Sequence, residues 1–322
     1  MDINLDDSGA GAGLGQSPGR VVLLSGGVGG ARLARGMAPV LGERLSVVVN
    51  VGDDDEVYGL TVSADLDTVL YTVADLQGPH GWGVQDDSFT VMDELERFGV
   101  DTTFRLGDRD LALCLHRTTR LADGTPLSAV TAELAAAHGL DLRLLPATDD
   151  RLRTIVEIAD GSRLAFQDYF VRRRHRDDVA ALHFAGSEEA KPAPGVVEAI
   201  AAAELVVIAP SNPPLSIWPI LAVEGIRRAV EEARRVIAVS PLFGGAALKG
   251  PADHVMAGLG LAAGTAGVLE AYDGLLTDLV VDHGDAADVD LGGDVTIHVA
   301  DTRIADPVAA ERFAVRLLGL AR

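Results

Sequence analysis

After position 20 the chain opens with a pattern that predicts a strand, a glycine-rich turn, a helix and a second strand. The apolar run VVLLS begins at Val21, and GGVGGA follows it directly from Gly26 to Ala31. A second apolar run extends from Val47 to Val51 and is interrupted only by Asn50. Short apolar runs bounded by glycine are typical of buried strands, and a β-α-β unit pairs its strands in parallel. The pattern therefore predicts a parallel sheet with helices packed on it.

The same alternation of apolar runs and helical segments returns in the last third of the chain. Apolar runs extend from Leu205 to Pro210 and from Arg235 to Pro241, and a helical segment separates them. We predict an α/β fold with a Rossmann-like, mostly parallel sheet flanked by helices. This fold forms a single domain over residues 20–322, with its core at about 20–75 and 195–322.

The middle of the chain, at about 78–190, has a different texture. Helical segments come first. Apolar runs on either side of Asp160-Gly161 then predict a β-hairpin, because Asp-Gly favours a tight hairpin turn. We interpret this region as an inserted helical plus β-hairpin subdomain. Residues 1–19 are acidic and glycine-rich without an apolar core, which predicts a disordered tail.

Composition excludes several classes of function. The formal net charge is −21, so the chain repels phosphate backbones and we expect no nucleic-acid partner. The single cysteine, Cys114, excludes an internal disulfide and a multi-cysteine metal site. No stretch is long and apolar enough to cross a membrane, and the N-terminal segment does not have the pattern of a signal peptide. We therefore expect a cytoplasmic protein without a membrane partner.

Acidic residues crowd into the stretch that follows the second apolar run. Asp53, Asp54 and Asp55 come first, and Asp65 and Asp67 follow later in the same stretch. Neighbouring carboxylates repel one another, and their burial is costly unless a cation lies among them. A divalent metal or the hydroxyls of a polar ligand would supply that interaction, and a solvated acidic loop is the alternative. Oxygen ligands without histidine spacing favour Mg²⁺ over zinc.

Four loops, each following an apolar run, are predicted to share one edge of the sheet. They span residues 26–30, 50–55, 211–214 and 240–250. Ligands of open parallel sheets bind outside the carboxyl ends of the strands, so these loops form the predicted site. The N–H groups of the glycine loop and the hydroxyl of Ser211 suit phosphate oxygens, and Lys249 is a candidate counter-charge. A glycine turn that only closes a tight crossover is the alternative, because the loop is neither GxGxxG nor a Walker A motif.

No protein nucleophile is evident in the sequence. Ser25, Ser211 and Ser240 have no histidine in an obvious triad order, so we interpret them as phosphate-binding or turn hydroxyls. A polar cluster at 107–110 precedes an apolar helical stretch, and His116 and Arg117 lie about two turns downstream.

Five blocks occur in the following order: GGVGGA; NVGDD with VSADLDTVLYT; LGDRDLALCLHRT; APSNPPLSIWPIL; and VSPLFGGAALKGPAD. Together they extend from about Val21 to Asp253 and resemble the 2-phospho-L-lactate transferase family of coenzyme F420 biosynthesis. The resemblance implies Mg²⁺-dependent transfer of a phosphoenolpyruvyl or 2-phospho-L-lactyl group from its guanosine diphosphate ester. The acceptor would be the ribityl hydroxyl of the deazaflavin Fo, and the products dehydro-F420-0 (or F420-0) and GMP. A composition rich in Ala, Arg and Asp favours the bacterial phosphoenolpyruvate type.

The resemblance also implies roles for individual residues. Asp53 and Asp67 are the first choices for metal ligation or for orienting the attacking hydroxyl, and Asp54 and Asp65 are the next metal ligands. The residues expected to contact substrate are Gly26, Gly27, Gly29, Gly30, Asn50, Asp54, Thr68, Asp108, Arg109, Ser211, Asn212 and Lys249. Such a transfer needs positioning and charge neutralisation more than covalent catalysis, which agrees with the lack of a nucleophile. The expected partners are these small molecules and a second copy in a homodimer.

Two other functions stay open at this point. A non-catalytic nucleotide-sugar-binding regulator of the same fold shares the glycine-rich start, although the NVGDD, DLDT and LGDRDL motifs are similar to those of the transferases. A dinucleotide oxidoreductase would place a ribose-binding acid near Asp53. Its glycine pattern is broken here, and no proton-relay residue is evident.

Overall fold

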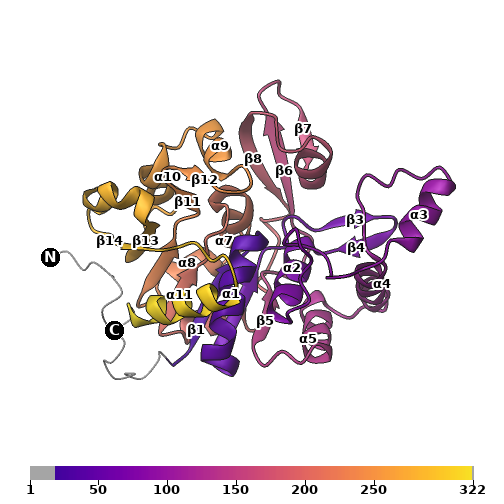
Figure 1. Cartoon of the computed structure of the whole chain (residues 1–322), viewed down its shortest axis with the longest axis horizontal. Coiled ribbons are helices and arrows are strands. Elements are labelled where there is room, and N and C mark those ends of the chain that lie inside the picture. Colours follow the sequence, from indigo (N-terminus) through magenta and orange to yellow (C-terminus); the bar gives the residue numbers. More distant parts are fainter. Residues whose placement is uncertain (1–18, 321–322) are drawn as a thin grey trace.

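The structure is a computed structural model, and it describes residues 19–320. The predicted disordered tail, residues 1–19, lies outside this part except for Gly19. Within it, seven parallel strands form one sheet in the order β14-β13-β10-β9-β1-β2-β5 (Figure 1). The strands are β1 (Val21–Ser25), β2 (Leu45–Val49), β5 (Arg143–Pro146), β9 (Leu205–Ile208), β10 (Val236–Val239), β13 (Asp278–Asp282) and β14 (Thr296–Ala300). The chain winds outward from β1 in both directions, so the predicted Rossmann-like α/β fold is confirmed.

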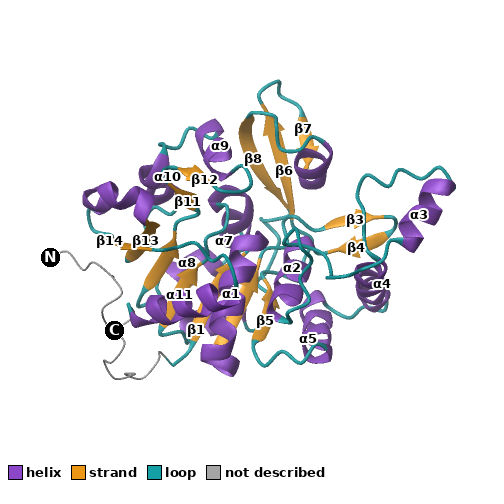
Figure 2. Cartoon of the chain, in the orientation of Figure 1, coloured by secondary structure: helices purple, strands orange, loops and turns teal. Residues whose placement is uncertain are grey.

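Helices flank this sheet (Figure 2). The helices are α1 (Gly27–Leu41), α2 (Ala64–Val73), α3 (Thr90–Arg97), α4 (Asp108–Ala122), α5 (Leu127–Ala137), α6 (Val196–Ala201), α7 (Trp218–Leu221), α8 (Ile226–Glu231), α9 (Ala252–Gly258), α10 (Gly264–Ala271) and α11 (Pro307–Gly319). Helix α1 packs between α2 and α11, and α6 packs against α8. No helix within residues 19–320 has the length and apolar character that crossing a membrane requires.

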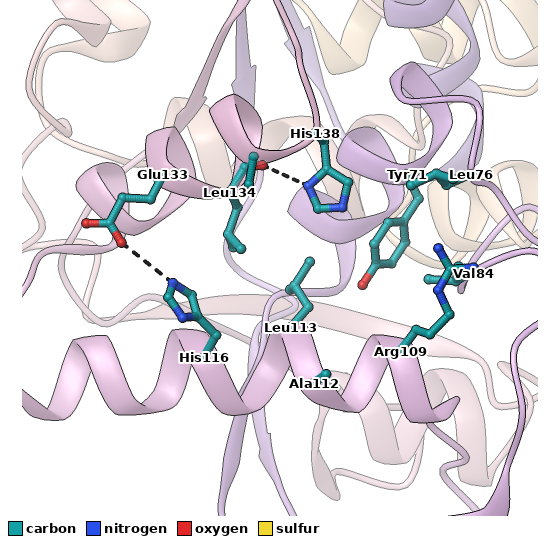
Figure 3. Close-up of a pocket in the computed structure, with 11 residues that line it drawn as sticks. Tyr71, Leu76, Val84, Arg109, Ala112, Leu113, His116, Glu133, Leu134 and His138 are labelled. Carbon is teal, nitrogen blue, oxygen red and sulfur yellow. Dashed lines mark hydrogen bonds and ion pairs between the residues drawn. The ribbon is translucent and has the colours of Figure 1, made fainter.

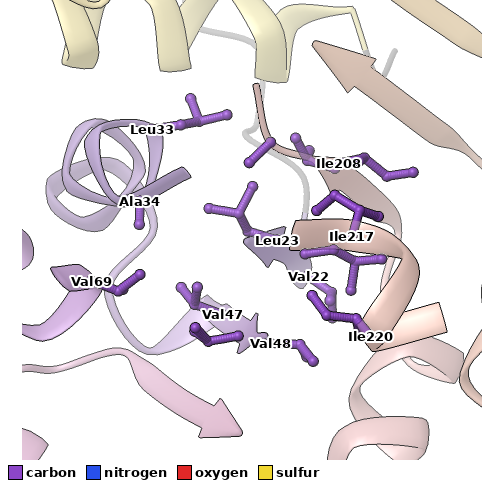
Figure 4. Packing of buried hydrophobic residues seen from close by; sticks show 14 of the residues in the cluster. Val22, Leu23, Leu33, Ala34, Val47, Val48, Val69, Ile208, Ile217 and Ile220 are labelled. Carbon is purple, nitrogen blue, oxygen red and sulfur yellow. The ribbon is translucent and has the colours of Figure 1, made fainter. Parts of the chain in front are cut away.

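The core is continuous because the central strands are apolar along their whole length. Every residue of β1 and β2 is buried, as expected for parallel strands covered on both faces. Leu23 of β1 lies beside Val47 of β2 in register, and neither side chain is exposed. Leu33 and Ala34 of α1 and Val69 of α2 belong to the same buried cluster (Figure 4).

The predicted insertion at 78–190 needs one correction. Strand β5 lies inside this range, yet it pairs in parallel with β2 and forms the edge of the main sheet. Its short apolar run, LRLLP, is equally compatible with a hairpin strand and with a buried parallel strand, so the sequence pattern did not separate the two.

The structure also differs from the prediction within the core segment, 20–75. Strands β3 (Asp55–Val57) and β4 (Leu60–Val62) leave the main sheet as an antiparallel ribbon that projects together with α3 and α4 (Figure 1). The insertion therefore consists of this projection with α5 and, after β5, of a separate three-stranded sheet.

The separate sheet contains the predicted hairpin. Strands β6 (Arg153–Ile158) and β7 (Arg163–Ala165) pair antiparallel around Asp160-Gly161, which confirms the hairpin. Strand β8 (Val179–Ala185) pairs with the other edge of β6. A short ribbon, β11 (Leu242–Phe243) and β12 (Ala246–Ala247), follows β10.

Gly36 of α1 provides a test of how closely α1 and α11 pack. A Cβ atom at Gly36 would overlap the backbone carbonyl of Ala310, whereas one at Gly319 would meet open space. Gly→Ala normally stabilises a helix by about 0.5–1 kcal/mol. We expect Gly36→Ala instead to lower the free energy of unfolding by about 1–3 kcal/mol, and Gly319→Ala to leave it unchanged or slightly raised. Urea denaturation measures both, and equal effects of the two substitutions would contradict the close packing.

Candidate active site

The loops that follow β1, β2 and β9 interlock at the carboxyl edge of the sheet. The N–H of Asn50 donates to the carbonyl of Ser25 at 3.0 Å, which ties the second loop to the first. The hydroxyl of Ser211 donates to the carbonyl of Gly26 at 2.7 Å, which ties the third loop to the first. Strands β1 and β9 are also where the winding direction of the sheet reverses, the usual position of a ligand crevice. Three of the four predicted loops therefore come together.

The glycine loop requires glycine for steric reasons. Gly26 caps α1, and a Cβ atom there would lie 2.7 Å from a carboxylate oxygen of Asp65. Gly27 has a φ of 62°, which other residues rarely adopt. Its N–H donates to Oδ1 of Asp65 at 2.7 Å, so a carboxylate sits at the positive end of α1. The loop thus closes a tight crossover and also holds an acidic residue of the predicted site.

Asp53 and Asp65 are both buried at this edge, and their charges interact. Asp65 accepts at its second oxygen from the side chain of Asn50 at 3.0 Å. Asp53 is buried, and within the described residues its Oδ1 has no hydrogen-bond partner. Burial and then the charge of Asp65 raise the pKa of Asp53 well above its usual range, and burial raises the pKa of Asp65 to about 6. Two carboxylates in this arrangement need a cation to stay ionised together.

Asp54 adds a third carboxylate to the same interior. Its Oδ2 accepts from the hydroxyl of Ser63 at 2.8 Å. Its Oδ1 is buried and lacks a partner in the part of the chain that the structure describes. Burial raises the pKa of Asp54 to about 7, and the positive charge of Arg153 opposes that shift.

Asp67 faces away from Asp65. Residues two positions apart on a helix point in nearly opposite directions, so Asp65 faces the sheet while Asp67 faces α4. There Arg117 donates to both oxygens of Asp67, and its Nη1 also lies 3.3 Å from the carbonyl of Thr61. Burial raises the pKa of Asp67, and the charge of Arg117 opposes this. The structure therefore gives Asp67 a cationic partner from the protein itself.

Arg117 was not predicted as a site residue, although a signal was available. It shares a buried helix face with Leu113 and Cys114. A charged residue on such a face is rarely buried without a partner of opposite charge. Asp110 lies on the same face, and burial and then the charge of Asp67 raise its pKa to about 7.

The donor atoms at this edge fit a hard cation and an anionic ligand. Within residues 19–320, nine buried side-chain atoms lack a hydrogen-bond partner, and five of them belong to the residues of this edge: Ser25 Oγ, Asp53 Oδ1, Asp54 Oδ1, Thr154 Oγ1 and Asn212 Nδ2. Buried polar groups are seldom left unpaired, so such a group of atoms marks a ligand position. Carboxylate and hydroxyl oxygens are the ligands that Mg²⁺ prefers.

The inserted three-stranded sheet also reaches the acidic loop. The N–H of Thr154 donates to the carbonyl of Gly52 at 2.8 Å, and Gln167 donates to the carbonyl of Asp53 at 2.9 Å. The sequence contains no local signal for either contact, because each joins segments about 100 residues apart.

Other predicted site residues lie elsewhere. Asp108 caps α3, where its carboxylate accepts from the N–H groups of Thr90 and Val91, each at 3.0 Å. Lys249 is exposed, and no hydrogen bond or ion pair among the described residues joins it to the acidic loop. Thr68 is buried in the second turn of α2, and its carbonyl accepts from Thr72.

Arg109 lines a separate cavity of about 480 Å³ between α2, α4 and α5 (Figure 3). Its lining includes His116 and Glu133, whose Nε2 and Oε2 atoms lie 3.6 Å apart, and the buried side chains of Leu113 and Leu134. None of the acidic-loop residues lines it. We therefore place the candidate active site at the sheet edge and not in this cavity.

A family model described as 2-phospho-L-lactate transferase CofD matches residues 21–305. The chain belongs to this family. A phosphoenolpyruvate transferase from Streptomyces griseus is 45% identical over 279 residues, which cover 84% of this chain and 88% of that protein. A phosphoenolpyruvate transferase from Thermobifida fusca is 40% identical over 317 residues, which cover 94% of this chain and 98% of that protein. A 2-phospho-L-lactate transferase from Methanopyrus kandleri is 39% identical over 304 residues, covering 93% and 96%.

This member of the CofD family is a transferase, so the enzyme prediction is confirmed over the non-catalytic alternative. Among solved structures, a protein of the UPF0052 family from Bacillus halodurans superposes with a TM-score of 0.56. The match covers 95% of this chain and 91% of that one. At 17% identity it supports the fold alone.

The buried carboxylate of Asp54 predicts an unusual pH dependence of stability. Its pKa is raised to about 7, so the folded protein holds this proton more tightly than the unfolded chain. The contribution of Asp54 to stability is thus greatest below its ordinary pKa and is lost as pH rises toward 7. With divalent cations chelated, the free energy of unfolding of Asp54→Asn should equal that of wild type near pH 4. Above pH 7 it should exceed the wild-type value by up to about 4 kcal/mol.

Urea denaturation across this pH range measures the difference in unfolding free energy between the two proteins. Added Mg²⁺ should narrow the gap at high pH, because a cation stabilises the ionised carboxylate. If the difference in unfolding free energy between the two proteins does not change with pH, then groups of the protein already stabilise the ionised carboxylate of Asp54.

Proposed function

We propose that this transferase moves a phosphoenolpyruvyl group from its guanosine diphosphate ester to the terminal ribityl hydroxyl of Fo. The observation that carries the proposal is the group of unpaired oxygens of Asp53 and Asp54 beside Asp65. They lie at the same sheet edge as the glycine loop and Ser211. An acidic cation site next to a phosphate-type loop is what transfer from a diphosphate ester requires.

The choice of donor follows the names of the relatives. The Streptomyces and Thermobifida proteins, at 40–45% identity, are phosphoenolpyruvate transferases, and the Methanopyrus protein, at 39%, is a 2-phospho-L-lactate transferase. The identities differ little, so the 2-phospho-L-lactyl ester is the second donor to test.

We assign Mg²⁺ to Asp53, Asp54 and Asp65, because Oδ1 of Asp53 and Oδ1 of Asp54 are buried without a hydrogen-bond partner among residues 19–320 and the charges of Asp65 and Asp54 act on Asp53. The positive charges of Arg153 and Arg117 act on Asp54 from its surroundings. The ion would neutralise these carboxylates and the charge of the diphosphate. Asp67, also predicted as a ligand, has both oxygens on Arg117. We therefore propose that Asp67 holds the first turn of α2 in place. Direct binding of the metal ion by Asp67 stays a prediction.

The donor's phosphates would bind at the start of α1. The positive end of this helix favours anions, and the N–H groups of its first turn beyond Gly27 would donate to them, since Gly27 itself donates to Asp65. Ser211 holds the loop through Gly26. Asn212 accepts from the N–H of Leu215 with its Oδ1 at 3.1 Å, while its buried Nδ2 has no partner among residues 19–320. This amide nitrogen can donate to a phosphate oxygen.

In the proposed reaction the ribityl oxygen bonds to the phosphorus that carries the three-carbon acid. The bond between that phosphorus and the bridging oxygen breaks, and GMP leaves with the oxygen. Asp53 accepts the proton of the hydroxyl, since its Oδ1 is buried at this edge without a hydrogen-bond partner among residues 19–320. The products are dehydro-F420-0 and GMP.

Mass spectrometry of the purified protein with Fo, Mg²⁺ and each guanosine diphosphate ester tests this function. We expect dehydro-F420-0 and GMP in equal amounts with the phosphoenolpyruvyl donor. Absence of product with both donors would contradict the proposal.

The carboxylate of Asp53 should be essential for turnover. We expect Asp53→Asn to lower kcat by about 100-fold or more, because it removes both a base and a metal ligand. Asp55→Asn is the matched control from the same acidic triplet, since Asp55 is half-buried and accepts from the N–H of Glu56. Steady-state kinetics should separate the two variants, and equal rates would remove Asp53 from the mechanism.

A further inference from the structure

Arg117 is a fully buried cation beside the acidic loop. Its side chain is 2% exposed, and its guanidinium donates to both oxygens of Asp67. The contact joins the middle of α4 to the first turn of α2. A planar guanidinium with two parallel donors holds a carboxylate in one orientation, which a lysine cannot do.

A second carboxylate lies close to this pair. Asp110, Cys114 and Arg117 are spaced four and three residues apart on α4 and therefore share one face. Ligand atoms of Asp67, Asp110 and Cys114 lie within 4.8 Å of one another. Tyr71 fixes Asp110 by donating its hydroxyl at 2.8 Å. Two carboxylates thus approach each other here, and Arg117 is their neighbouring positive charge.

The buried carboxylates consequently form two groups that meet at Asp54. Asp53 and Asp65 lie on the side of the glycine loop and Asn50, and Asp54 interacts with Asp53 and also with Asp67 and Arg117. Asp67 and Asp110 face α4 and include Arg117 in their contacts. Many phosphoryl-transfer sites of clustered carboxylates hold two divalent ions a few ångströms apart. Here the second group already contains a fixed positive charge.

We propose that Arg117 acts as a built-in cation in place of a second divalent ion, so that the site takes one exchangeable ion. Arg117 is then a positioning residue that acts through Asp67 and does not touch substrate. The proposal rests on the proposed function only in placing the exchangeable ion at Asp53, Asp54 and Asp65. Its test counts bound metal and needs no substrate.

The experiment uses Mn²⁺ alone with the full chain. Electron paramagnetic resonance and isothermal titration calorimetry count the ions bound and give their affinities. We expect one Mn²⁺ per wild-type chain. Arg117→Met keeps the length of the side chain and removes its charge, so Asp67 and Asp110 become free to bind a second Mn²⁺. The double variant Asp67→Asn/Arg117→Met should return to one ion.

Arg235→Met is the matched control. Arg235 donates two hydrogen bonds to Asp278, at 3.0 and 2.8 Å. Asp278 is buried at the start of β13, where the amino ends of the parallel strands lie, away from the candidate site. Arg235→Met should lower the midpoint of thermal unfolding without changing the number of Mn²⁺ ions bound per chain. Arg117→Met should also melt at a lower temperature in metal-free buffer, and Mn²⁺ should raise its midpoint more than that of wild type.

Two ions in wild type, or one ion of unchanged affinity in a folded Arg117→Met protein, would overturn the proposal. If Arg117→Met folds only when millimolar Mn²⁺ is present, the proposal is supported. If it stays unfolded with Mn²⁺ while the double variant folds, the metal does not replace Arg117 and the proposal fails. The proposed function fails separately, through absence of transfer product or an Mn²⁺ count that Asp53→Asn leaves unchanged.

Discussion

Negative charge buried at the carboxyl edge of the sheet is the constraint on which this structure depends. An uncompensated buried carboxylate costs several kcal/mol, so each one here requires a partner. Asp65 accepts from an N–H at the start of α1 and from Asn50, and Asp54 accepts from Ser63. Asp67 is paired with Arg117. Loops from distant parts of the chain are held together by these contacts, and Oδ1 of Asp53 and Oδ1 of Asp54 stay unpaired within residues 19–320.

The first turn of α2 carries one buried carboxylate toward the main sheet and another toward the projection formed by β3, β4, α3 and α4. Because Asp65 and Asp67 point to opposite sides of one helix, the same turn is bonded to the glycine loop and to α4. The projection is therefore connected to the site through a buried ion pair as well as through the chain. The inserted three-stranded sheet reaches the same loop through Thr154 and Gln167. Both insertions thus contribute to the shape of the acidic interior.

This arrangement suits a transferase that works by positioning. The members of the CofD family named here share 39–45% of their residues with this chain over most of its length. The site contains anchored carboxylates, a helix N-terminus and buried amide and hydroxyl groups. In the proposed reaction, these groups would lower the barrier by orienting the diphosphate ester and by electrostatic stabilisation, without a covalent intermediate.

Much of the fold and part of the site could be predicted from the sequence. Apolar runs followed by glycine or polar loops identified the strands of the parallel sheet, because burial on both faces requires continuous apolar residues. The rule that ligands bind at the carboxyl ends of such strands then placed the glycine loop, Asp53 and Ser211 together. These inferences depend on local pattern and on one general property of α/β sheets.

Only the tertiary structure decided which partner each polar residue has. Sequence patterns did not show that β5 joins the main sheet, that Asp108 caps α3, or that Asp67 is paired with Arg117, 50 residues away. Hydrogen bonds and ion pairs depend on distances of about 3 Å between side chains. Such distances are set by how whole helices pack, and a sequence motif limits only which residue types are available to meet.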